Sequence, residues 1–107
     1  NTITGIEQGK NIPEYYSLSQ NYPNPFNPTT IIKYSIPASL NPSKGGTLVS
    51  LKVYDVLGRE VTTLVNEEKQ PGNYEVKFDG SNISSGVYFY RLQAGSFTET
   101  KKFVLIK

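Results

Sequence analysis

The chain has 107 residues, 36% of them hydrophobic, and its 11 basic and 9 acidic side chains give a formal net charge of +2. This length suits one domain rather than two, and a charge so small and scattered does not predict nucleic-acid binding. Cysteine and histidine are absent, which excludes disulfides and thiolate metal sites and removes the commonest catalytic base. No apolar run approaches the roughly 20 residues of a membrane span, so no integral membrane segment is expected.

The chain begins with a polar stretch. Residues 1–14 contain two glycines and a proline, and we expect a linker or processing region there. Methionine is absent even at position 1, so we expect a fragment of a longer protein, with any export signal upstream. The short aromatic segment Tyr15–Leu18 is predicted as the first strand of a domain that spans residues 15–107.

A proline-rich run, Asn21–Pro28, follows this first strand. Each proline fixes its own φ and removes a hydrogen-bond donor, and it pushes the residue before it toward extended geometry. The run can therefore be neither a helix nor a central strand. We expect a stiff, extended lead-in that gives Tyr22, Pro23, Pro25 and Phe26 structural roles.

Six further strands are predicted from alternating apolar side chains and the turn residues between them. They are Thr29–Ile36, Leu48–Leu57, Glu60–Val65, Tyr74–Phe78, Val87–Ala94 and Phe97–Ile106. Gly58-Arg59 is predicted as a two-residue hairpin connection, and Asn66–Gly72 as a charged turn. Seven short strands with frequent turns predict an all-β, immunoglobulin-like antiparallel β-sandwich.

The segment Ser84–Tyr90 resembles the corner that enters strand F of an immunoglobulin-like domain. In that corner a tyrosine hydroxyl bonds back to the upstream backbone, two residues before the usual cysteine. Tyr88 is the expected corner tyrosine, and Tyr90 takes the place of the cysteine. The strand Val87–Ala94 is apolar on both faces, as a central strand would be.

Catalytic and metal sites find little support in the residues. Nucleophilic catalysis by serine needs a nearby base, and without histidine that base would have to be a lysine. Every lysine here falls in a polar strand-face or turn position, which argues against a serine–lysine dyad. The nearest carboxylate pairs, Glu67-Glu68 and Asp55 with Glu60, fall in or beside turns, where acidic residues are ordinary. A calcium site from Asp79, Asn82 and carbonyl groups would lack the usual run of oxygen ligands. The sequence therefore predicts no enzyme, no metal ion and no cofactor.

Aromatic side chains gather near the start of the domain: Tyr15, Tyr16, Tyr22 and Phe26. Exposed aromatic rings can serve as platforms for sugars, whereas buried ones fill the core or cover the edge of a sandwich. We expect the structural role for this cluster. Sugar binding is the alternative.

The last strand ends with Lys101–Lys107, which is both apolar and basic. It is either an ordinary final strand or a recognition element, because the edge of a strand can offer unpaired N–H and C=O groups to a partner.

Four blocks together resemble the type A C-terminal sorting domains of the type IX secretion system. They are Ser17–Thr30, Val53–Val61, Gly86–Leu92 and Lys101–Lys107, in the expected order over roughly residues 15–107. The immunoglobulin-like domain of flagellar hook-assembly proteins shares the central hairpin pattern. The link around Leu40–Gly46 is longer than the family's usual connection, which affects the expected loop geometry more than the function.

The resemblance implies a non-catalytic sorting signal at the C-terminus of a secreted protein from the Bacteroidetes–Chlorobi group. Its partners would be the translocon, shuttle and sortase-like components, together with a covalently attached upstream cargo. The cargo would pass through the periplasm to the outer-membrane surface or the medium, and cleavage would fall among residues 1–14. The alternative is a carbohydrate-binding or spacer module of a secreted glycoside hydrolase.

The same resemblance implies which residues carry recognition. The expected recognition residues are Gly58, Arg59, Gly86, Lys101, Lys102, Phe103, Val104, Leu105, Ile106 and Lys107. Tyr88 and Tyr90 are expected to be structural, holding the sheets together with Val53 and Phe78. The mechanism we expect is recognition of the folded shape and of the terminal strand.

Overall fold

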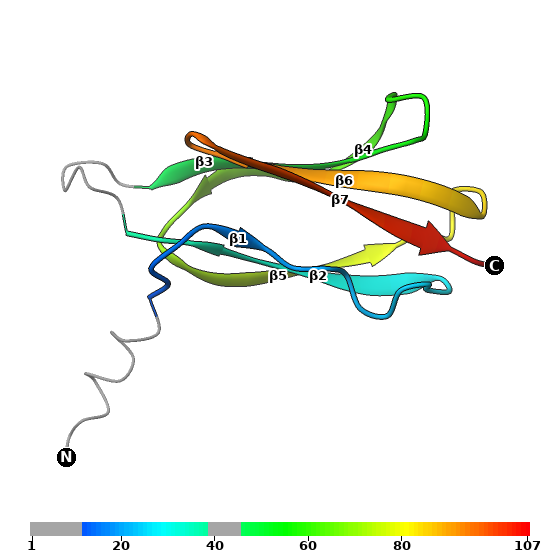
Figure 1. Ribbon diagram of the computed structural model, residues 1–107, viewed down its shortest axis with the longest axis horizontal. Helices are drawn as coiled ribbons and strands as arrows, with labels where there is room; N and C mark the ends of the chain where they lie inside the picture. The colour runs from blue at the N-terminus through cyan, green and yellow to red at the C-terminus, as the bar shows by residue number, and fades with distance from the viewer. Residues whose placement is uncertain (1–11, 39–45) are drawn as a thin grey trace, which may run out of the picture.

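Two antiparallel sheets pack face to face in the computed structural model, which describes residues 12–38 and 46–107 (Figure 1). One sheet has three strands in the order β1-β2-β5: Ser17–Leu18, Thr29–Ile36 and Gly72–Asp79. The other has four strands in the order β4-β3-β6-β7: Glu60–Lys69, Thr47–Tyr54, Gly86–Ala94 and Phe97–Leu105. The predicted seven-stranded, all-β sandwich is thus confirmed in the described residues.

The order of the strands follows the immunoglobulin pattern. The first, second and fifth strands share one sheet, as strands A, B and E do, and the third, sixth and seventh share the other, as C, F and G do. The fourth strand, β4, pairs with β3 and forms one edge of the four-stranded sheet. Residues 70 and 71 carry the chain from this edge to the opposite sheet.

Alternation along the strands places one apolar row of each sheet in the shared interior. Val49, Leu51 and Val53 of β3 are fully buried, as their spacing predicts. The strand β6 differs from expectation, because only its even-numbered side chains from Tyr88 to Ala94 are buried. Its other row, including Val87 and Phe89, lies on the outer face of the sheet, where the side chains are exposed or half-buried.

Phe103 of β7 is the centre of an aromatic cluster in the core. Its ring centroid lies 4.9 Å from that of Phe26, 5.6 Å from Phe78, 5.7 Å from Tyr88 and 5.8 Å from Tyr90. These rings come from both sheets and from the proline-rich run, so one side chain of the last strand contacts all three parts of the fold.

Two tyrosine hydroxyls fix backbone segments beside the core. The Tyr88 hydroxyl donates a hydrogen bond of 2.6 Å to the carbonyl oxygen of Ser84, which is the geometry of a tyrosine corner. The Tyr90 hydroxyl donates to the Ser19 carbonyl at 2.7 Å and accepts from the Asn21 N–H at 2.9 Å. Burial raises the pKa of Tyr90 to about 12, which keeps the hydroxyl protonated and able to donate.

The segment Ser19–Pro28, which we call the clasp, bends across the sandwich rather than forming the extended lead-in that its prolines predict. At Tyr22 it pairs with Ile31 of β2, and at Phe26 it pairs with Leu105 of β7. The chain must bend between these points because they belong to different sheets. Inside the bend, the Asn21 side-chain amide donates to the Thr30 hydroxyl at 3.0 Å, and both residues are buried.

Several predicted boundaries are wrong. The first strand contains only residues 17 and 18, and β3 stops at Tyr54 instead of Leu57, so the connection to β4 is the five-residue turn Asp55–Arg59. The strand β4 continues through Lys69 into the stretch predicted as a charged turn. It can do so because a strand at the edge of a sheet tolerates charged side chains. Most of residues 1–14 and of the Leu40–Gly46 link lie outside the described residues.

The hydroxyl of Tyr90 provides a test of the clasp. We expect Tyr90→Phe to lower the free energy of unfolding by about 1–3 kcal/mol, because the Ser19 carbonyl and the Asn21 N–H lose a buried partner. Urea denaturation at neutral pH measures this change. Tyr15→Phe, on an exposed side chain, is the control and should change stability by less than about 0.5 kcal/mol. Equal stabilities of the two variants would contradict the assignment.

Candidate functional site

Several of the expected recognition residues gather at one end of the sandwich, which we call the distal end. It consists of the turn Asp55–Arg59, the corner Ser81–Gly86 and the last residues, Ile106 and Lys107 (Figure 1). The described N-terminal residues, from Ile12, approach the sandwich from its other end (Figure 1). The sandwich therefore separates these residues from Ile12, the first residue that the structure describes.

The carboxylate of Asp55 organises the turn Asp55–Arg59. Its Oδ1 accepts hydrogen bonds of 2.9 Å from the backbone N–H groups of Leu57 and Arg59, and its Oδ2 accepts another of 2.9 Å from Arg59 Nε. The Arg59 backbone N–H, followed by its side chain and the Leu57 N–H, lowers the pKa of Asp55. Gly58 has a φ of 84°, a left-handed conformation that glycine adopts without strain.

The tip of this turn presents apolar side chains to solvent. Val56 is 65% exposed and Leu57 73% exposed, although polar residues are the usual choice in turns. The predicted recognition pair, Gly58 and Arg59, directly follows this tip, and the Arg59 side chain is largely exposed. Sequence reasoning missed Asp55, Val56 and Leu57 as parts of the site. The aspartate itself could have indicated this turn, because an aspartate side chain often accepts a hydrogen bond from the backbone N–H two residues further on, here that of Leu57.

The terminal segment Lys101–Lys107 divides between core and surface. Phe103 and Leu105 are buried, whereas Lys102, Ile106 and Lys107 are exposed. Lys107 is held at the corner, since its backbone N–H donates to Ser85 Oγ at 3.0 Å and its Nζ to the Ser81 carbonyl at 2.7 Å. Gly86, at the start of β6, pairs with Leu105 beside this contact.

The clasp occupies the outer edge of β7 along its last residues. Gln20 Nε2 donates to the Lys102 carbonyl at 2.7 Å, and the Val104 N–H donates to Asn24 Oδ1 at 3.0 Å. Phe26 donates its N–H to the Val104 carbonyl and accepts from the Ile106 N–H, both at 3.0 Å. The unpaired edge considered from sequence is therefore not open over residues 102–106, and a partner strand could pair there only after the clasp moved.

The aromatic residues near the start of the domain have different environments. Phe26 is buried, and the Tyr16 ring stacks on Phe97 at 5.2 Å, so both have the structural role expected of the cluster. Tyr15 and Tyr22 are exposed. The Tyr22 backbone still anchors the clasp through two hydrogen bonds to Ile31.

The residues that could hold a metal or act as acids do not converge. Within residues 12–38 and 46–107, no three acidic side chains lie close enough together to bind a metal ion. Asp79 bonds Ser81 locally, and Glu60 bonds Thr63 and lies 3.6 Å from Lys52. In the same part of the chain, no helix is long and apolar enough to cross a membrane.

Comparison with known protein families identifies a family to which the chain belongs. The sequence profile described as a secretion system C-terminal sorting domain matches residues 20–107. This range contains nearly all of the clasp, the strands β2 to β7 and every expected recognition residue. A search of curated proteins finds no match to the chain.

The turn Asp55–Arg59 predicts a distinctive titration. We expect the pKa of Asp55 to lie below 3.8, so the stability that its carboxylate provides is present at neutral pH and is lost as the pH falls below 3.8 through the lowered pKa of the folded state. Arg59→Ala should raise the pKa of Asp55 only part of the way, because the two backbone donors remain. Carboxyl NMR titration measures both values.

Asp79 is the internal control for this titration. Its pKa is lowered by the hydroxyl and N–H of Ser81, so it should not respond to Arg59→Ala. An Asp55 that titrates at or above 3.8 would show that the turn is not organised as described.

Proposed function

We propose that this chain, which belongs to the family of secretion system C-terminal sorting domains, directs an attached cargo protein across the outer membrane through the type IX secretion system. The observation that carries the proposal is the family match over nearly the whole folded domain. In this role the domain is a non-catalytic substrate of the export machinery.

The arrangement of the distal end supports this role. The turn Asp55–Arg59 and the C-terminal residues lie at the end of the sandwich opposite Ile12, the first described residue, which favours their access to a receptor when a cargo precedes the domain (Figure 1). The exposed side chains of Leu57, Arg59, Ile106 and Lys107 offer both apolar and positively charged groups to a receptor. We propose that the translocon binds this end of the folded domain.

We propose the finer steps by analogy with the family. Shuttle and sortase-like components would receive the exported protein, and cleavage would fall within residues 1–14, which precede the family match. The cargo would then remain on the outer-membrane surface or enter the medium. Under this proposal the sandwich is the part that is recognised, and the lead-in is the part that is cut.

Export of a reporter tests the proposal. Residues 1–107 are fused to the C-terminus of a fluorescent protein with a signal peptide, in a host with an active type IX system and in its translocon mutant. We expect fluorescence at the surface or in the medium of the first strain and in the periplasm of the second. Periplasmic retention in both strains would overturn the sorting role.

Recognition must be separated from folding, because deleting Lys101–Lys107 also removes Phe103 and Leu105 from the core. The sharper variant combines Leu57→Glu with Ile106→Glu, which replaces two exposed apolar side chains at the distal end by negative charges and leaves the Asp55–Arg59 and Lys107–Ser81 contacts in place. We expect lower export with a folded domain, as judged by circular dichroism of the purified variant.

Gln93→Glu is the matched control, because it adds a negative charge at an exposed position near the end of β6 that lies away from the distal end. It should be exported like the parent. Normal export of the double variant would show that the distal end is not the surface that the translocon binds.

A further inference from the structure

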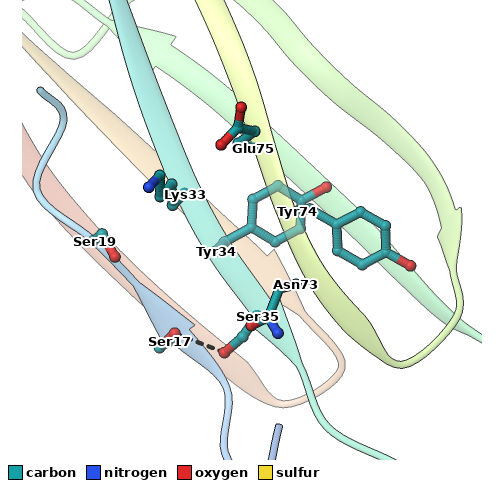
Figure 2. Close-up of a pocket in the computed structure, with 8 residues that line it drawn as sticks. All are labelled: Ser17, Ser19, Lys33, Tyr34, Ser35, Asn73, Tyr74 and Glu75. Atoms are coloured by element: carbon teal, nitrogen blue, oxygen red, sulfur yellow. Dashed lines mark hydrogen bonds between the residues drawn. The ribbon is translucent and has the colours of Figure 1, made fainter. Parts of the chain in front are cut away.

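The outer face of the three-stranded sheet carries a groove that the sorting role does not use. It consists of two adjoining hollows of about 480 and 430 Å³, which share Lys33 of β2 and Glu75 of β5. Both hollows are open to solvent, so a ligand would lie along the sheet rather than inside an enclosed cavity. Figure 2 shows the first hollow, with Ser17 and Ser35 at one end and Lys33 and Glu75 toward the other. Gln20 and Tyr22 of the clasp line the second hollow.

Small hydroxyl side chains line one side of the first hollow. Ser17 and Ser35 share a hydrogen bond of 2.6 Å between their hydroxyls, and Ser35 also donates to the Tyr15 carbonyl at 2.9 Å. The Ser19 backbone is fixed by its N–H, which donates to the Lys33 carbonyl at 2.9 Å. Because these side chains are short, they leave room above the sheet for a ligand.

Two opposite charges face each other across the groove without pairing. Lys33 and Glu75 are directly opposed in the register of β2 and β5, yet no ion pair joins them. Directly opposed charges on one face of a sheet commonly pair. Here the lysine can donate and the carboxylate can accept hydrogen bonds from a bound molecule. Their charges sum to zero, so the groove has no preference for an anion or a cation.

Tyr22 adds an aromatic surface beside these polar groups. Its side chain is 80% exposed, whereas its backbone is bonded twice to Ile31, which lines the same hollow. The anchored backbone keeps the exposed ring beside the groove, where its apolar face is available to a ligand. Tyrosine is suited to surfaces where one side of a ligand is apolar and the other forms hydrogen bonds.

We propose that this groove binds a neutral oligosaccharide. A pyranose ring has an apolar face of C–H groups that can pack on Tyr22. Its hydroxyls can accept a hydrogen bond from Lys33, donate one to Glu75, and do either with Ser19. Anionic glycans and nucleic acids fit less well, because Glu75 lies next to the only lysine that lines the groove in the described residues. This activity goes beyond the proposed sorting function and does not depend on the export machinery.

NMR titration of the isotope-labelled 107-residue chain tests the proposal. The neutral probes are cellohexaose, xylohexaose, mannohexaose and maltohexaose, which also distinguish linkage and sugar, and an alginate hexasaccharide is the anionic probe. We expect at least one neutral probe to shift the backbone amide signals of Ser19, Lys33 and Glu75. No shift with any neutral probe, or a shift with alginate alone, would overturn the proposal.

Variants of Tyr22 separate ligand contact from folding. Tyr22→Ala should weaken binding roughly three- to tenfold, the size expected of one aromatic contact, whereas Tyr22→Phe should bind like the parent. Tyr15→Ala is the matched control, because Tyr15 is equally exposed but does not line the groove. Equal binding by Tyr22→Ala and the parent would contradict the proposal, as would weaker binding by Tyr15→Ala alone.

Discussion

The contact between Phe103 and the four rings around it is the interaction on which the rest of the structure depends. These rings belong to the clasp, to β5 and to β6, so the two sheets and the N-terminal segment meet at one side chain of the last strand. Aromatic pairs at such distances contribute about 0.5–1.5 kcal/mol each beyond the area that they bury. The core is therefore complete only when the C-terminal strand is in place.

Because the core needs the C-terminal strand, this strand cannot act as a free peptide signal while the domain is folded. The segment Lys101–Lys107 contains two core residues and an edge that is bonded to the clasp, so most of its side chains and backbone groups are committed to the fold. The groups that remain for a partner, including Lys102, Ile106 and Lys107, keep their positions because the core holds the backbone behind them. Under the proposed sorting function, a receptor would distinguish a folded domain from an unfolded one through the same residues.

Local sequence patterns predicted the strands better than the connections. The alternation in Thr29–Ile36 gave the bounds of β2, because one face of that strand is buried along most of its length. Alternation failed at Val56 and Leu57, where the Asp55 carboxylate captures two backbone N–H groups and bends the chain. The path of the clasp could not be predicted, because the bond from Val104 to Asn24 joins residues 80 positions apart. The groove likewise depends on register between β2 and β5, which a single strand does not reveal.

The coverage of β7 by the clasp also bears on self-association. An uncovered, apolar final strand would be a template for pairing with a second molecule, and such pairing leads to aggregates. In the described residues the other edges are less exposed to this hazard, because β1 is only two residues long and β4 and β5 carry charged side chains such as Glu68 and Lys77. The segment that begins the domain thus protects its end, because a second molecule cannot pair with residues 102–106 while the clasp is bonded there.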